Sequence, residues 1–89
     1  YKMQLAKKID HIAIAVKDLD AAVATFVANF GFPVSRKGSV PSLQIERAFL
    51  GIGQASLELI QPTDERNPMA KFLAEQGEGM YLLSLEVDD

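Results

Sequence analysis

The sequence predicts an α+β domain whose mixed sheet is built from a β-α-β-β-β (βαβββ) unit. Apolar residues alternate with a period of two in several short segments, which is typical of half-buried strands. After the first such segment, apolar residues recur every three to four positions, which indicates an amphipathic helix packed on the sheet. The pattern of the first strand returns near the end of the chain, which indicates an internal repeat.

The composition limits both size and function. The 89 residues allow one small domain, and 48% hydrophobic with 24% charged residues is ordinary for a folded protein. The absence of cysteine excludes disulfides and thiolate metal sites. A net charge of −3 argues against a nucleic-acid-binding face. No apolar run approaches the roughly 18 residues of a membrane span and no leader pattern is seen, so we expect a cytoplasmic protein.

The first predicted strand covers residues 9–16. Its alternation places bulky branched residues on one face and small residues with a single imidazole on the other: Ile12, Ile14 and Val16 against His11, Ala13 and Ala15. We expect the bulky face to pack on a helix and the small face to leave room for a ligand.

A helix is predicted directly after this strand. Asp18 is a typical N-cap, and Gly31 stands where a C-terminal glycine belongs. The stripe that should cover the sheet consists of Leu19, Ala22, Val23, Phe26, Val27 and Phe30. The bulky strand face and this stripe together predict a strand–helix core.

Three further extended segments are predicted at residues 34–37, 43–50 and 56–61, separated by a loop at 38–41 and a turn at 51–53. A polar linker follows. Asn67 can then cap a second helix with Pro68 at its first position and Gly77 at its end. The last strand is expected at residues 80–87.

Residues 10–18 repeat in residues 81–89, so that His11 falls on Leu82 and Asp18 on Asp89. The apolar positions correspond one to one, with Ile12, Ile14 and Val16 matching Leu83, Leu85 and Val87. The repeat divides the chain into a first βαβββ module (1–62), a linker with a linking helix (63–79), and the first strand of a second, incomplete module (80–89).

The segment KIDHIAIAVKDLDAA at residues 8–22 resembles the vicinal-oxygen-chelate superfamily of glyoxalases, bleomycin-resistance proteins and dioxygenases. Within it, the chain is most similar to the methylmalonyl-CoA epimerases, in the segments AFLGIG (48–53), LELIQP (57–62), AKFLAEQGEGM (70–80) and LEVDD (85–89). The resemblance implies a curved mixed sheet that forms a cup around a metal or ligand site, with helices on its outer face.

The resemblance also implies a set of site residues. His11 and Glu58 match two metal ligands of the epimerases, whereas the position of a third ligand, a histidine, holds Leu82. Leucine cannot coordinate a metal. The expected cofactor is a divalent ion of the cobalt, zinc, manganese or nickel class, or none. Glu46 is a weak candidate for a catalytic base. The expected pocket lining is Ala13, Ala15, Leu82 and Ser84.

Purely structural roles remain possible for the same residues. His11 can be a hydrogen-bonded, half-buried strand residue, and Glu58 can face solvent on an alternating strand. Arg47 is either a solvated edge residue or a contact for a phosphate or carboxylate.

Three functions therefore compete. The first is an isomerase or lyase of the epimerase or glyoxalase type acting on a small molecule such as an acyl-CoA, with activity in doubt because of Leu82. The second is a metal-free drug-binding protein of the bleomycin-resistance type. The third is a protein that works by association, since one module with an extra strand exposes sheet edges that a homodimer would cover.

Overall fold

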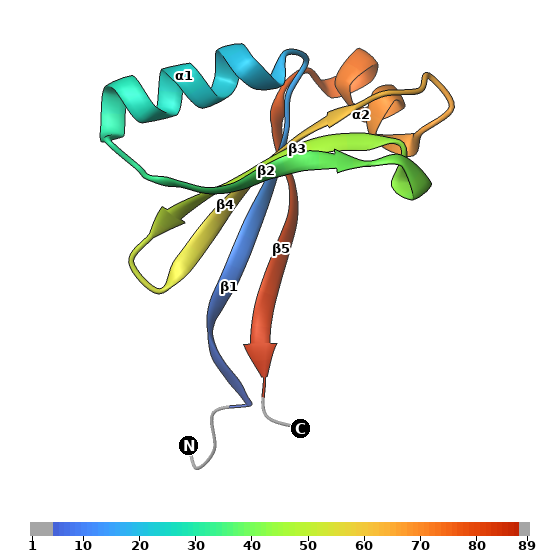
Figure 1. Cartoon of the computed structure of the whole chain (residues 1–89). Coiled ribbons are helices and arrows are strands. Elements are labelled where there is room, and N and C mark those ends of the chain that lie inside the picture. Colours follow the sequence, from blue (N-terminus) through green and yellow to red (C-terminus); the bar gives the residue numbers. More distant parts are fainter. Residues whose placement is uncertain (1–4, 88–89) are drawn as a thin grey trace.

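The computed structural model describes residues 5–87 and shows one five-stranded sheet with the strand order β2-β3-β4-β1-β5 (Figure 1). β1 pairs in parallel with β4, and all other neighbours are antiparallel, so the sheet is mixed as predicted. No helix in this part of the chain is long and apolar enough to cross a bilayer. The elements are β1 (Ala6–Ala15), α1 (Leu19–Phe30), β2 (Val34–Val40), a 3-10 turn (Pro41–Leu43), β3 (Ile45–Ile52), β4 (Ala55–Pro62), α2 (Pro68–Gln76) and β5 (Gly79–Val87).

Both helices begin at the predicted caps. The Asp18 carboxylate accepts a hydrogen bond from the Ala21 N–H, and the Asn67 side chain accepts one from the Met69 N–H. Gly31 ends α1 with a φ of 70°, a left-handed conformation that favours glycine. Side-chain caps are local interactions, which is why the sequence predicts them well.

The strands differ from the predictions at their ends. β2 continues to Val40 through the predicted loop, because Val40 pairs with Ile45 and Gly38 with Arg47 of β3. The turn between β3 and β4 lies at residues 53–54 rather than 51–53, since Gly51 is still paired with Ser56. Pairing with a neighbouring strand decides these ends, and a single segment does not reveal its partner.

The core under α1 contains most of the predicted residues of the bulky strand face. Its buried members are Val16, Leu19, Ala48, Leu50, Leu57 and Leu59, with Ile14, Val23 and Phe26 packed against them. The prediction was wrong for Val27 and Phe30, which are 40% and 62% exposed. Only the first two turns of α1 pack on the sheet, and Phe30 stacks instead on Phe32 with ring centroids 5.3 Å apart.

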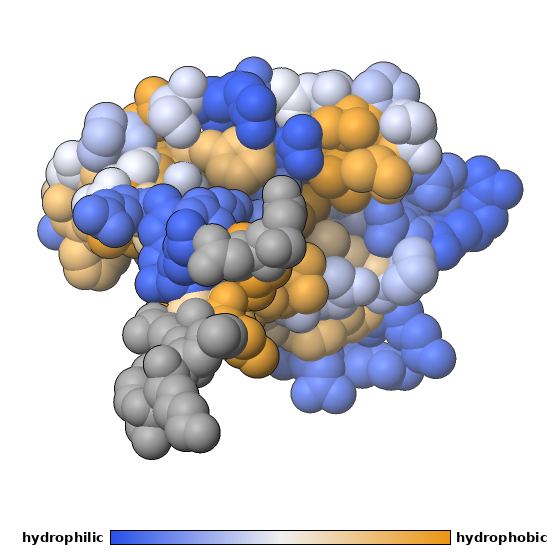
Figure 2. Space-filling model, turned by 90° about the horizontal axis from the view of Figure 1, so that it is seen from below, coloured by the Kyte–Doolittle hydropathy of each residue, from blue (hydrophilic) through white to orange (hydrophobic). Residues whose placement is uncertain are grey.

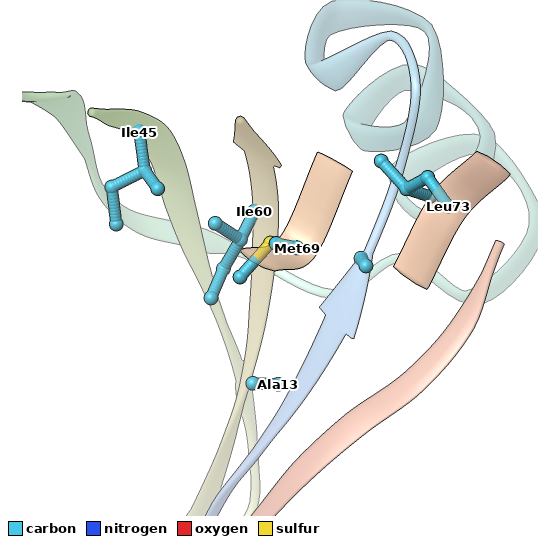
Figure 3. Close-up of a cluster of buried hydrophobic side chains, with 6 residues drawn as sticks. Ala13, Ile45, Ile60, Met69 and Leu73 are labelled. Atoms are coloured by element: carbon cyan, nitrogen blue, oxygen red, sulfur yellow. The ribbon is translucent and has the colours of Figure 1, made fainter. Parts of the chain in front are cut away.

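A second core lies between the sheet and α2. Figure 3 shows Met69 of α2 directed toward Ile60 of β4, with Leu73 one turn further along the helix. Ala13 and Ala15 are 0% exposed within this cluster. The expectation that these small residues leave room for a ligand is therefore corrected, because their size instead allows α2 to approach the sheet.

β1 and β5 pair with a two-fold symmetry that follows the sequence repeat. His11 pairs with Ser84 and Ala13 with Leu82; Leu82 follows His11 by 71 residues, and Ser84 follows Ala13 by the same number. The register shifts on either side of these pairs leave Asp10 of β1 and Tyr81 of β5 without partners, and these two residues are also repeat equivalents. The repeat is thus present in the backbone of the described strands, whereas its last match, Asp89, lies outside the described residues.

Candidate functional site

The candidate metal ligands His11 of β1 and Glu58 of β4 lie on the same side of the sheet. Glu58 pairs directly with Ala13 of β1 on one side and with Phe49 of β3 on the other. The side chains of directly paired residues on neighbouring strands point to the same side of the sheet. Arg47 and Phe49 of β3 therefore share this side with His11, which we call the inner face. α1 covers the opposite side.

Glu58 is a buried carboxylate, only 6% exposed. Its Oε1 lies 3.5 Å from His11 Nε2, and its Oε2 accepts a hydrogen bond of 3.2 Å from the Arg47 guanidinium. Buried carboxylates need such partners, because burial of an unpaired charge is costly. The solvent-facing interpretation of Glu58 is therefore excluded.

His11 is oriented by the residue before it. Asp10 Oδ2 lies 2.8 Å from His11 Nδ1, which leaves Nε2 directed toward Glu58. A carboxylate on the second ring nitrogen is the usual partner of a metal-ligating histidine. Adjacent strand residues normally point to opposite faces, and the bulge at Asp10 permits this contact. The alternation of strand residues therefore does not predict Asp10 as a site residue.

Phe49 is the aromatic neighbour of this group. Its ring meets the His11 ring edge to face, with centroids 6.2 Å apart. Two guanidinium carbons also lie over it, that of Arg36 at 4.6 Å and that of Arg47 at 5.2 Å from the ring centroid. Arg36 and Phe49 were not predicted as site residues, and the short basic pair at residues 36–37 was the only signal for the former.

Of the other candidates, Glu46 lies apart from this group, whereas Leu82 and Ser84 lie on its side of the sheet. Glu46 pairs with Gln61 and is exposed on the opposite side of the sheet. Leu82 and Ser84 lie on β5 level with Ala13 and His11, and Leu82 is 53% exposed. The position that repeats His11 therefore offers an apolar side chain beside the inner face.

The donor set fits a divalent metal ion only in part. Two ligands about 2.1 Å from one ion at a tetrahedral angle are about 3.4 Å apart, and His11 Nε2 and Glu58 Oε1 are separated by 3.5 Å. Among residues 5–87, however, no group of three or more metal-binding side chains occurs. These two residues can supply two positions of a coordination sphere, and the rest must come from elsewhere.

Comparison with known proteins assigns this architecture to a family. The sequence profile of the glyoxalase/bleomycin resistance protein/dioxygenase superfamily matches residues 10–89. The chain belongs to this superfamily.

Several relatives in the superfamily are epimerases. Human mitochondrial methylmalonyl-CoA epimerase is 32% identical over 92% of this chain and 47% of its own length. The crystal structure of the Mycobacterium tuberculosis methylmalonyl-CoA epimerase superimposes with a TM-score of 0.89 at 31% identity, over 100% of this chain and 61% of that one.

A Streptomyces coelicolor methylmalonyl-CoA epimerase variant in complex with 2-nitronate-propionyl-CoA gives a TM-score of 0.87 at 34% identity, over 94% of this chain and 64% of that one. The chain thus spans between about half and two thirds of the length of these relatives. These matches confirm the predicted superfamily and fold.

Proposed function

We propose that this chain supplies half of an epimerase-type site, in which His11 and Glu58 hold a divalent metal ion beside an acyl-CoA substrate. The observation that supports this most is the pair of donor atoms, His11 Nε2 and Glu58 Oε1, aligned 3.5 Å apart on the inner face. The epimerases among the relatives support the substrate class. A homodimer or a second module would supply the remaining ligands.

A bound divalent ion would stabilise negative charge on a carbonyl oxygen next to the carbon that loses its proton. Two further residues of this chain hold the proposed metal ligands in position. Asp10 fixes the ring orientation of His11, and Arg47 keeps the Glu58 carboxylate in place through its second oxygen. Glu46, the weak candidate for the proton-transferring base, lies on the other side of the sheet from His11 and Glu58, which argues against that role.

Metal-free binding of a small apolar molecule is the second candidate. Two observations favour it: Leu82 occupies the position that repeats His11, and the Arg47 guanidinium already compensates the charge of Glu58. A cation beside this arginine would experience repulsion, which weakens any metal site.

Titration calorimetry with cobalt and zinc distinguishes the two candidates. His11→Ala should abolish binding, and Leu82→His should strengthen it at least tenfold by adding a nitrogen ligand on the inner face. Leu83→His is the matched control, because the neighbouring residue is level with Ile12 and points to the opposite side. The control should bind as the parent does.

The same titrations can contradict the proposal. If His11→Ala binds metal as tightly as the parent, His11 is a structural residue and the metal-free function is favoured. If Leu82→His and Leu83→His behave alike, the orientation of β5 toward the inner face is wrong.

A further inference from the structure

Arg36 on the edge strand β2 has a fixed position and unused hydrogen-bonding capacity. Its guanidinium lies 4.6 Å from the Phe49 ring centroid, and it makes no hydrogen bond or ion pair within residues 5–87. Stacking on an aromatic ring restrains a guanidinium while leaving its N–H groups free to donate. Arg36 is therefore held in place for a partner that the described part of the chain does not provide.

The cleft beside Arg36 is polar and includes the candidate metal ligand His11. It has a volume of about 390 Å³ and is lined by Arg36, His11, Gln54 and Ser56 among others. Neither the Gln54 amide nor the Ser56 hydroxyl bonds to another described residue. The Asp10 carboxylate in the same cleft already bonds to His11. Three unused groups of this cleft can therefore donate hydrogen bonds to a ligand: the Arg36 guanidinium, the Gln54 amide and the Ser56 hydroxyl.

The positive charges that lie against the Phe49 ring exceed the negative charge that pairs with them. Two guanidiniums, those of Arg36 and Arg47, lie against one ring. Of these two guanidiniums, only that of Arg47 pairs with the buried carboxylate of Glu58. A second anion next to Arg36 would relieve the repulsion between the two cations.

We propose that Arg36, with Ser56 and Gln54, binds an anionic group of the ligand whose reacting end lies at His11 and Glu58. A guanidinium suits this task because its planar fork binds a carboxylate or phosphate through two parallel hydrogen bonds. The proposal deepens the proposed function and rests on it for the location of the ligand. The anionic group is either the carboxylate of a malonyl-type acyl group or a phosphate of the CoA moiety.

The test uses malonate and inorganic phosphate as separate probes, titrated into the whole chain with EDTA present and followed by amide chemical shifts. The parent should saturate with at least one probe. Arg36→Gln should weaken this binding about tenfold or more, since it removes a charged hydrogen-bonding partner. Arg36→Lys should recover only part of it, because an ammonium lacks the fork. Tighter malonate binding identifies the acyl carboxylate as the source, and tighter phosphate binding identifies the CoA moiety.

Arg66→Gln is the charge-matched control. Arg66 makes its ion pair with Asp64 in the linker before α2 and does not line the cleft. This variant should bind both anions as the parent does. Equal binding by Arg36→Gln and the parent, or no saturation of the parent by either probe, would overturn the proposal. Because EDTA removes metal ions, this failure is separate from a failure of the metal titrations with His11→Ala.

Discussion

The buried Glu58 links the stability of the domain to the chemistry of its inner face. Its carboxylate is almost inaccessible, whereas the Arg47 side chain that compensates it is 31% exposed. Removing one partner of a buried pair leaves the other charge without compensation. This arrangement makes the arginine more important for the fold than its partial exposure indicates.

Arg47→Met should therefore lower the free energy of unfolding by about 1–3 kcal/mol, the cost of leaving a buried hydrogen-bonding group unsatisfied. The double variant Arg47→Met with Glu58→Met should regain much of this loss, because both charges are gone. Urea unfolding followed by circular dichroism measures both values. Equal loss in the single and double variants would show that the pair does not stabilise the domain.

The predictability of the site also differs from residue to residue. His11 and Glu58 could be predicted because their positions in the strand pattern resemble those of a known family. Asp10 and Arg36 could not, since the first depends on a bulge and the second on stacking against a ring from another strand. Alternation within one segment contains neither kind of information.

Helix α1 is anchored by its first turn. Leu19 is 3% exposed and is the only buried side chain of the helix, whereas Phe30 is 62% exposed. Leu19→Ala should lower the unfolding free energy by about 2–5 kcal/mol through loss of packing. Phe30→Ala should lower it by less, about 1 kcal/mol, since it removes surface stacking only. Denaturant titrations of the two variants provide the comparison, and a larger loss for Phe30→Ala would contradict the observed packing of the helix.

In the linker before α2, the Asp64 carboxylate forms an ion pair with Arg66. The side-chain and backbone hydrogen bonds from Arg66 lower the pKa of Asp64 below its ordinary value of 3.8. A lowered pKa means that the ionised carboxylate stabilises the folded state above pH 3.8, and that this stabilisation disappears as the pH falls through the lowered value.

Asp64→Asn should therefore unfold at a lower temperature than the parent at neutral pH, and the difference should shrink on acidification. Thermal unfolding across the acid range measures this convergence. A difference that stays constant with pH would show that the ionised carboxylate is not involved.

Secondary structure could be predicted where local interactions determine it. The caps at Asp18 and Asn67 and the stop at Gly31 lie within a few residues of the hydrogen bonds they make. β2 was predicted too short because its partner, β3, determines its length. The packed stripe of α1 was predicted too long, since it included the exposed Phe30. An apolar stripe on a helix does not indicate how far the sheet beneath it extends.

On the face of the molecule that Figure 2 shows, hydrophobic surface is exposed in several patches between hydrophilic regions. The edge strand β5 contributes much of it: Met80, Leu82, Leu83, Leu85 and Val87 are between 48% and 63% exposed. Exposed apolar patches of this kind favour association with another surface. This supports the homodimer as a prediction.

Sedimentation equilibrium should accordingly show dimers of the chain at micromolar concentration, and Leu85→Lys should shift the equilibrium to monomers by placing a charge in the interface. Lys71→Glu, which changes charge on α2, serves as a control for nonspecific effects. A folded monomer of the parent at that concentration would contradict the prediction.

The position of β1 between β4 and β5 has a consequence for the order in which the chain acquires its structure. His11 pairs with Ser56 on one side and with Ser84 on the other, so both neighbours of β1 come from segments much later in the sequence. During synthesis β1 lacks its first neighbour until β4 has emerged, and its second edge stays uncovered until β5 has emerged. Closing such long loops is slow compared with local helix formation. Helix α1 can therefore form early, while the inner face that carries His11 and Glu58 forms only after β1 has paired with β4.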